Sequence, residues 1–389
     1  MTVTLGDHAG SGTGGQALAS RPRPRRTMTQ RIDALTGSLF LWPSILIILG
    51  MGIFPFVASI YLSLTRFELA KGGFKLTWVG LLNYRKLITG SERLHFLGKL
   101  GDPDLLGWVL ILAVAGGGLA LLWSRWRANE ATIGSSISFL IALGVAVGLT
   151  WLVASTVATG ARAGSLVVTI IYVVVGITFQ YLIGLGLALL CTMKLPGRRF
   201  FRVVFLLPMM ITPVGVAYMF RMMADTAKGP LQPLWAMAGL SNYSWTNDAW
   251  GARTAVMIGD VWQWTPFMFI VLVAALEGQP TDPIEAARVD GANDWDIFRF
   301  VTLPSILPVS TSLVLIRMIE AFKIVDLPRV LTNGGPGTAT ESLTLHAVII
   351  WRALDFGGAT AVSFLLVALV TVVATVFVNV ARARTTEAV

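Results

Sequence analysis

Four charged side chains recur at intervals of three residues in an otherwise apolar segment of the sequence. They are Arg317, Glu320, Lys323 and Asp326. A charge inside the hydrocarbon of a membrane is costly, so such residues usually face a cavity or a partner helix. Steps of three residues keep neighbours near one face of a helix. The pattern favours either a polar lining for a hydroxyl-rich ligand or a set of ion pairs between helices, and the sequence leaves both interpretations open.

A second set of polar and aromatic residues lies in the preceding apolar segment. The set comprises Asp260, Trp262, Gln263, Trp264 and Pro266. Aromatic faces can stack on the C–H faces of sugar rings, and an amide can form hydrogen bonds with hydroxyl groups. Tryptophan is also a common anchor at membrane interfaces. These residue types therefore suit a sugar contact or an interfacial anchor.

Between these two segments lies the polar stretch EAARVDGANDWDIFRFVTLP, residues 285–304. A helix start precedes it, because Asp282 can cap, Pro283 suits the first helical position and Glu285 can reach back as in a capping box. Gly291 permits a left-handed backbone or the close approach of another chain. The stretch therefore predicts a short helix that stops near this glycine.

A second short helix is expected after the glycine. Asn293 and Asp294 can start it, and Leu303-Pro304 should end it and turn the chain toward the next apolar segment. The result is a helix–glycine–helix elbow whose small residues let a partner approach closely. The alternative is an ordinary interfacial loop whose aromatic residues rest in the lipid headgroups.

The composition indicates which elements carry these residues. Of the 389 residues, 55% are hydrophobic and only 13% are charged, whereas a soluble domain carries about 25% charged residues. Several windows exceed the roughly 20 apolar residues that cross a bilayer. We therefore predict an all-α integral membrane protein with eight spans, at residues 39–65, 105–123, 135–157, 165–191, 203–224, 254–276, 307–329 and 357–381.

Charge placement predicts the orientation of these spans. Residues 1–38 are too polar to bury a core, so we expect a disordered tail rather than a cleaved signal peptide. This tail carries Arg21, Arg23, Arg25, Arg26 and Arg31. Positive residues favour the cytoplasmic side, and the basic segment 66–104 breaks this rule, although long loops cross despite their charge. With eight spans, both termini and the loop 277–306 are cytoplasmic in this multi-pass protein.

The sequence lacks the motifs that are typical of several chemistries. It contains no G-x-x-x-x-G-K-[ST] and no G-x-S-x-G, which argues against ATP binding by a P-loop and against a hydrolase nucleophile. Cys191 is the only cysteine, and His8, His95 and His346 are too far apart for an H-E-x-x-H zinc motif. The basic residues are scattered over loops rather than gathered on one face. We therefore expect neither enzyme activity, nor a metal or cofactor in this chain, nor nucleic-acid binding.

The polar stretch 285–304 resembles the EAA loop of permease subunits of bacterial carbohydrate ABC importers of the maltose and glycerol-phosphate type. The matching residues are Glu285, Ala286, Ala287, Gly291, Ile297, Leu303 and Pro304. Three further segments are similar to the same family: VGLLNYRKLI at 79–88, FRVVFLLPMMITPVGVAYMFRMM at 201–223 and DLPRVLTNGGPGTATESLTLH at 326–346. The resemblance covers most of residues 39–88 and 165–381.

This resemblance implies a function, a fold, a set of partners and a location in a bacterial inner membrane. The fold is the type I importer permease, and the chain pairs with a second permease and two cytoplasmic ATPase subunits, which hold ATP and Mg²⁺. The EAA loop docks on the ATPase as a coupling helix. A solute-binding protein delivers a carbohydrate from outside, an oligosaccharide or disaccharide, and the region 317–346 resembles the alpha-glucoside branch. The glycine-rich loop with Asn333, Gly334, Gly335 and Pro336 faces the binding protein or forms a re-entrant turn.

The sequence departs from the family pattern in two places. Residues 89–164 hold two additional spans, so we expect four regions: 1–38, 39–88, this insertion and a permease core at 165–389. Val325-Asp326 replaces the Phe-Asp of many relatives, which weakens any transfer of sugar specificity. The rival function is an ATP-independent secondary transporter. Such a protein typically shows an internal repeat of similar halves, and we find no clear repeat.

Overall fold

The computed structural model describes residues 41–127, 133–157, 162–193 and 196–385. The predicted tail 1–38 lies outside these residues. The chain divides into two units, Met1–Ala58 and Ser59–Val389. In the first unit, residues 41–58 are helical with a π-helical turn η1 (Ile48–Ile53), and their apolar side chains are almost all exposed. An apolar helix exposed on all sides suits a lipid environment.

The second unit opens with the end of α2 (Phe54–Ser63) and a β-hairpin that the all-α prediction did not contain. Strands β1 (Thr65–Ala70) and β2 (Gly73–Trp78) pair antiparallel with Thr65 opposite Trp78. Gly72 and Gly73 adopt positive φ in the turn, a conformation that glycine accepts without strain. The alternation of apolar and polar residues in both strands, within a segment expected to be a loop, is the local signal for this hairpin.

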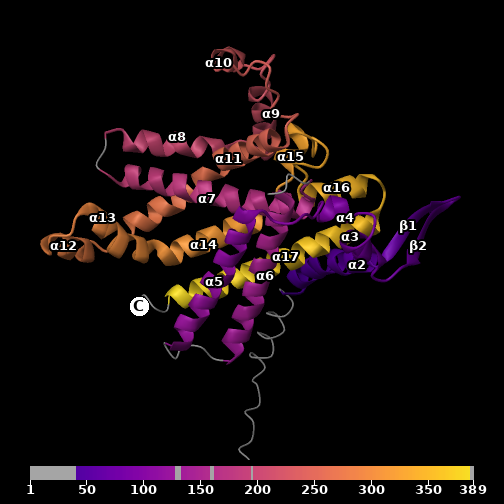
Figure 1. Cartoon of the computed structure of the whole chain (residues 1–389), viewed down its shortest axis with the longest axis horizontal. Coiled ribbons are helices and arrows are strands. Elements are labelled where there is room, and N and C mark those ends of the chain that lie inside the picture. The colour runs from indigo at the N-terminus through magenta and orange to yellow at the C-terminus, as the bar shows by residue number, and fades with distance from the viewer. Residues whose placement is uncertain (1–40, 128–132, 158–161, 194–195, 386–389) are drawn as a thin grey trace, which may run out of the picture. The chain divides into compact units, whose positions relative to one another are not determined.

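The remaining elements of the second unit are helices (Figure 1). They are α3 (Leu82–Ile88), α4 (Arg93–Phe96), α5 (Leu105–Arg127), α6 (Ile133–Val157), α7 (Ser165–Thr192), α8 (Arg198–Met210), α9 (Pro213–Met223), α10 (Gln232–Met237), α11 (Ala249–Glu277), α12 (Asp282–Val289), α13 (Asp294–Ile297), η2 (Phe298–Thr302), α14 (Leu303–Ala321), α15 (Asp326–Leu331), α16 (Leu343–Arg352) and α17 (Phe356–Thr385). Within the described residues seven helices are long and apolar enough to cross a membrane, or eight if the bent pair α8–α9 is one span. The predicted set of eight spans is therefore confirmed on the second count.

The core of the second unit forms where α7 and α11 lie along one another, with α14 beside them (Figure 1). Gly184 of α7 permits this approach, because a Cβ at this position would meet Met268 Cβ of α11 at 2.7 Å. Met268, Phe269 and Leu272 of α11 are fully buried against this face. Burial of an apolar side chain of this size contributes about 2 kcal/mol in water, whereas between lipid-immersed helices close packing is the main stabilising term.

The fifth predicted span is broken, and its two prolines, Pro208 and Pro213, lie close to the break. Helices α8 and α9 meet at a bend of 95°. Pro213 occupies the start of α9, and Thr212 Oγ1 accepts a hydrogen bond from the N–H of Gly215 at 3.3 Å. Proline removes a backbone donor from a helix interior, so a break at this position leaves fewer unpaired groups than a continuous helix would.

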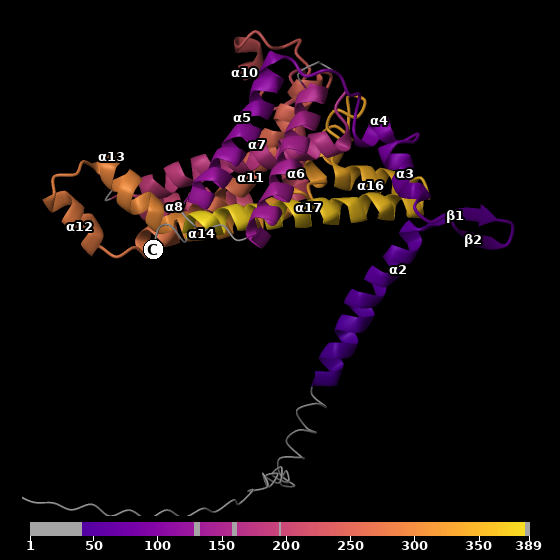
Figure 2. The same cartoon turned by 60° about the horizontal axis from the view of Figure 1, so that its bottom comes forward.

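The two inserted spans form a helical hairpin, α5–α6, and α6 contacts α7 and α17 (Figures 1 and 2). Gly107 brings the start of α5 against Ala154 of α6, since an added Cβ would lie 3.0 Å from that of Ala154. Most side chains of α5 are exposed, including Leu110, Leu112 and Leu119. The hairpin therefore adds an apolar layer to the side of the core, and of its described residues only those at the end of α6 enter a buried cluster, through Leu152.

Candidate functional site

The predicted elbow exists as two short helices joined at Gly291. Helix α12 ends in a Schellman motif, in which the N–H of Ala292 donates to the Ala287 carbonyl at 3.0 Å and that of Gly291 donates to the Arg288 carbonyl at 3.1 Å. Gly291 has φ +83°, which explains the glycine. Asn293 then caps α13, because its Oδ1 accepts from the N–H of Asp296 at 2.9 Å.

Two details of the elbow differ from the prediction. The N-terminal cap position of α12 is Thr281 rather than Asp282, and no side chain caps it. Leu303-Pro304 does not stop the second helix, because α13, η2 and α14 follow one another without a gap from Asp294 to Ala321. The π-helical turn η2 explains this continuity. The Leu303 N–H donates to the Phe298 carbonyl, five residues back, and this shift in register places Pro304 in the first turn of α14, where its missing N–H is tolerated.

The elbow presents an exposed surface at one end of the second unit (Figure 2). Glu285, Ala286 and Gly291 are exposed, and a Cβ on Gly291 would meet nothing within 4 Å. Apolar side chains accompany them, since Val289, Trp295 and Phe300 are 88%, 65% and 67% exposed. Ala287 is half-buried and Ile297 is buried. Most residues of the predicted coupling loop are thus open to a partner, and Ile297 anchors the second helix.

A hollow of about 480 Å³ lies at the base of the elbow, between the end of α11 and the start of α14. Its lining includes Pro280, Pro283, Phe300 and Pro304. The Gln279 side chain spans the same region, because its Nε2 donates to the Thr302 carbonyl at 3.0 Å. This hydrogen bond ties the entry of the elbow to its exit.

A buried polar cluster joins α7, α11 and α14 in the core. The Arg317 Nη2 donates to both carboxylate oxygens of Asp260, at 2.8 and 2.7 Å, and its Nε donates to Gln180 Oε1 at 2.8 Å. The Gln180 Nε2 in turn donates to Asp260 Oδ2 at 2.8 Å. All three residues are at most 5% exposed, and the guanidinium lies 4.6 Å from the Trp264 ring centroid. Each of the three residues is hydrogen-bonded to the other two, so the cluster links three helices.

The charged row 317–326 does not share one face. Arg317 points into the core, whereas Glu320 and Lys323 are exposed and pair with each other at 2.7 Å. Asp326 begins the separate helix α15. A step of three residues turns a helix by about 300°, so each successive side chain drifts by about 60°. Arg317 therefore pairs with Asp260 of α11, and Glu320 pairs with Lys323.

The residues Trp262, Gln263 and Trp264 likewise have three different surroundings. Trp262 packs edge-on against Phe220, with ring centroids 5.7 Å apart. The buried Gln263 donates from Nε2 to the Ile211 carbonyl at the α8–α9 break, at 3.2 Å, and its Oε1 has no partner among the described residues. Trp264 lies under Arg317. Consecutive helical residues are about 100° apart, so the three cannot form one stacking surface.

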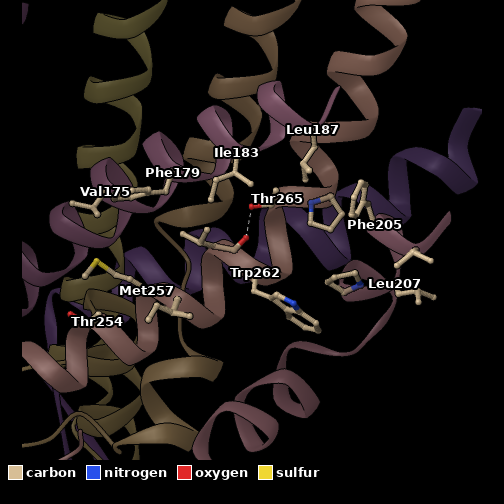
Figure 3. Close-up of a pocket in the computed structure, with 15 residues that line it drawn as sticks. Val175, Phe179, Ile183, Leu187, Phe205, Leu207, Thr254, Met257, Trp262 and Thr265 are labelled. Atoms are coloured by element: carbon tan, nitrogen blue, oxygen red, sulfur yellow. Dashed lines mark hydrogen bonds between the residues drawn. The ribbon is translucent and has the colours of Figure 1, made fainter. Parts of the chain in front are cut away.

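A cavity of about 790 Å³ lies among α7, α8 and α11 (Figure 3). Its lining is almost entirely apolar and includes Val175, Phe179, Phe205 and Trp262. The hydroxyl of Thr265 donates to the Val261 carbonyl at 2.6 Å and is thereby satisfied. A surface with so few free donors and acceptors suits an apolar occupant better than a sugar.

A polar hollow of about 760 Å³ borders α9, α15 and the segment after α9. Asn333, Gly335 and Pro336 line it, while Gly334 is buried. Asn333 and Gly334 have φ +50° and +88°, left-handed conformations that Asn and Gly adopt more readily than other residues. The remaining lining is rich in hydroxyl and amide groups, contributed by Thr226, Ser241, Asn242, Ser244, Thr246, Asn247 and Thr332. This loop therefore contributes to a surface with many hydrogen-bonding groups.

One carboxylate at the edge of this hollow is held ionised by its own turn. The backbone N–H groups of Lys228 and Ala227 donate to Asp225 Oδ1 at 2.9 and 3.0 Å. These two hydrogen bonds lower the pKa of Asp225 below its usual value, and the one from Lys228 has the larger effect. Arg221 lies at the same hollow and donates from Nη1 to the Val330 carbonyl at 3.0 Å. The hollow thus offers charges of both signs.

Sequence reasoning missed two groups of residues. Gln180, the third member of the buried cluster, is a lone amide in a long apolar span, and the cost of a buried amide was the available signal. His95 and His346 fit no local zinc motif, and the sequence holds no signal that they meet. The structure brings their rings to 5.8 Å between centroids, although they are far apart in sequence.

The fold and these sites define the class of protein as a multi-pass helical membrane protein with a broken span and an exposed helical elbow. The chain belongs to the family described as binding-protein-dependent transport system inner membrane component, whose model matches residues 180–386, more than half of its 389 residues. This confirms the resemblance found in the sequence. The chain is also similar to the trehalose/maltose transport system permease protein MalF of Thermococcus litoralis. The two are 34% identical over 217 residues, which cover 56% of this chain and 74% of the relative.

Solved structures support the same fold. A bacterial ABC transporter involved in the import of the acidic polysaccharide alginate aligns over 90% of this chain and 96% of the solved chain, with a TM-score of 0.56 and 16% identity. A bacterial alginate ABC transporter in complex with an alginate pentasaccharide-bound periplasmic protein aligns over 57% of this chain and 77% of the solved chain, with a TM-score of 0.51 and 20% identity. The chain therefore has the type I importer permease fold, and its relatives are transport permeases rather than enzymes.

Proposed function

We propose that this chain is the membrane-spanning permease subunit of an ATP-driven importer that carries a carbohydrate delivered by a solute-binding protein. Family membership supports the transport role. The carbohydrate is supported by the relative named for trehalose and maltose transport. We infer an oligosaccharide or disaccharide, with alpha-glucosides as the branch suggested by residues 317–346.

The observation that carries the proposal is the connection between the exposed elbow and the buried core. Helices α13, η2 and α14 form one connected segment that starts at the elbow and contains Arg317. A displacement at Glu285–Gly291 can therefore be transmitted along α14 to the Arg317–Asp260–Gln180 cluster, and from there to α7 and α11. We infer that a separate ATPase docks on this elbow, and that its closure moves the three helices together.

The proposed partners follow from this arrangement. They are a second related permease, two cytoplasmic ATPase subunits, an extracytoplasmic solute-binding protein and membrane lipid. The solved alginate transporter was captured with a periplasmic protein, which supports a partner of this kind. We place both termini and the elbow in the cytoplasm, and the polar hollow with Asn333, Gly335 and Pro336 toward the binding protein.

The proposed substrate pathway retains the six predicted residues with different roles. Gln263 offers the buried, unpartnered Oε1 beside the α8–α9 break, which suits a hydroxyl donor. Glu320, Lys323 and Asp326 lie at the end of α14 and the start of α15, where at least the first two are accessible. Trp264 supports Arg317, and Trp262 shapes the apolar cavity, so we assign these two to the wall of the pathway rather than to sugar stacking.

Purification of the chain from its native membrane in mild detergent, followed by mass spectrometry, tests this function. We expect a second permease and an ATPase in stoichiometric amounts, together with ATP hydrolysis that increases when binding protein and sugar are added. An ATP-independent secondary transporter would instead give a homo-oligomer with no ATPase in several detergents. That outcome would overturn the proposal and leave the elbow without a partner.

A further inference from the structure

Two histidines from distant parts of the sequence face each other in the second unit. His95 belongs to the short helix α4, and His346 to the first turns of α16, with ring centroids 5.8 Å apart and an angle of 69° between the rings. Together with Glu341, each residue offers a metal-ligating atom within 4.8 Å of the others. The surrounding apolar side chains of Leu87, Phe96 and Leu343 form one buried cluster that fixes α3, α4 and α16 against one another. The two imidazoles are therefore held close by packed elements.

His346 is buried in a state that leaves one nitrogen unused. Its side chain is 1% exposed, and its Nδ1 is hydrogen-bonded to the carboxylate of Glu341, which is itself 4% exposed. The carboxylate is an acceptor, so in the neutral form of the ring Nδ1 carries the proton and the lone pair lies on Nε2. The Nε2 atom is buried and has no hydrogen-bond partner among the described residues. A buried polar atom without a partner is costly, and a bound ion would remove this cost.

His95 has a related arrangement. Its Nδ1 lies 3.9 Å from Glu92 Oε2, so this ring also has a carboxylate beside Nδ1. Metal-ligating histidines commonly place one ring nitrogen against a carboxylate, which orients the ring and makes the other nitrogen more basic. His346 has that pattern through its hydrogen bond to Glu341, whereas the Glu92 carboxylate lies near His95 at a distance longer than a hydrogen bond. This arrangement leaves Nε2 of each ring for the ligating role.

The surroundings provide room and a favourable charge. A cavity of about 250 Å³ is lined by both histidines, Glu92, Asp355 and Lys86. Two carboxylates, those of Glu92 and Asp355, line this cavity together with one ammonium group, that of Lys86. The buried carboxylate of Glu341 lies beside His346, so the acidic groups outnumber the basic one and the local charge favours a cation. Asp355 Oδ1 already accepts from the Gly358 N–H at 2.8 Å and is held in place. The volume is enough for an ion and water molecules that complete its coordination.

We propose that His95 and His346, oriented by Glu92 and Glu341, bind a divalent transition-metal ion of the Zn²⁺ type. Imidazole nitrogen is a preferred ligand of Zn²⁺, whereas Mg²⁺ prefers oxygen ligands and octahedral geometry. His95 is half-exposed, so its ring can move the small distance that brings both Nε2 atoms onto one ion. The ion would fasten α4 to α16. Its binding requires none of the transport partners, so this site and the proposed transport function can fail separately.

The test is metal binding by the full chain, purified in detergent through a tag that contains no histidine. After treatment with a chelator, the chain is dialysed against buffered free Zn²⁺ and its metal content is measured. We expect one Zn²⁺ per chain, not displaced by millimolar Mg²⁺, and a higher Tm when Zn²⁺ is present. Substitutions His95→Ala and His346→Ala should abolish this stoichiometric binding. Glu92→Gln should weaken it by about tenfold to a hundredfold, as expected for a residue that orients a ligand.

The chain supplies its own control. It has three histidines, and the third, His8, lies outside the described residues. His8→Ala should bind Zn²⁺ like the wild type. Because His346 is buried and its replacement could disturb folding, the exposed His95 variant is decisive. The proposal is wrong if the wild type binds no stoichiometric Zn²⁺, or if His95→Ala binds it with unchanged affinity and Tm response.

Discussion

Arg317 illustrates how one residue organises the core. Its guanidinium donates hydrogen bonds to Asp260 and Gln180 and lies over the Trp264 ring. Each partner comes from a different helix than Arg317 itself. The cluster is thus a structural joint between α7, α11 and α14, and its polar groups are too well satisfied to bind a substrate without rearrangement.

Removing one charge from this joint should cost far more than removing an exposed charge. Asp260→Asn leaves a buried guanidinium without its counter-ion, and we expect unfolding in detergent to become easier by about 3–5 kcal/mol. The control is Glu320→Gln, which breaks the exposed pair with Lys323 and should cost less than about 1 kcal/mol. Equal stability of Asp260→Asn and the wild type would contradict the joint. A change in sugar uptake by Glu320→Gln, with assembly intact, would favour a role for Glu320 in the pathway.

At the scale of elements, the sequence predicted the features that depend on residues close together in the chain. The spans follow from apolar length, the α8–α9 break from Pro208 and Pro213, and the start of α13 from Asn293. The hairpin β1–β2 was not predicted, because the charged residues of segment 66–104 indicate a loop. The continuation of the helix past Pro304 depends on a π-helical turn, which no proline rule anticipates.

The contacts between elements could not be predicted from the sequence. Whether Arg317 pairs with Glu320 three residues away or with Asp260 on another helix is decided by how α11 and α14 pack. The meeting of His95 and His346 depends in the same way on the packing of α4 against α16. Spacing along the chain carries no information on either pairing, so only the residue types could be predicted.

Two glycines of α7 test the close packing of this helix. An Ala at Gly184 would place its Cβ 2.7 Å from Met268 Cβ, whereas the exposed Gly186 has nothing within 4 Å. We expect Gly184→Ala to destabilise the chain by about 1–3 kcal/mol through overpacking. Gly186→Ala should leave stability unchanged or raise it by up to about 1 kcal/mol, because alanine favours the helix. Thermal unfolding of both variants in the same detergent decides the matter, and equal Tm values would show that α7 and α11 can separate without cost.

At the scale of the whole molecule, the question is whether the elbow moves with the transmembrane helices. The proposed coupling needs a fixed angle between α12 and α13, and this angle depends on the Schellman motif at Gly291. Helix α10 ends in the same motif at Gly239, where the Leu240 N–H donates to the Trp235 carbonyl and the Gly239 N–H to the Ala236 carbonyl. Gly239 also has positive φ, +72°, and open space around it. The two glycines are therefore matched in local geometry and differ in location.

Gly291→Val should uncouple transport, since a β-branched residue at φ +83° is strained by about 1–2 kcal/mol and will change the turn. We expect the variant to insert in the membrane and to lose about tenfold or more in sugar uptake, because a change of about 1.4 kcal/mol in an equilibrium is tenfold. The amount of ATPase that co-purifies with the Gly291→Val chain should also fall. Gly239→Val carries the same strain and should retain the ATPase like the wild type. If Gly291→Val keeps both the ATPase and normal uptake, the elbow does not transmit the motion, and the connected segment 294–321 has a purely structural role.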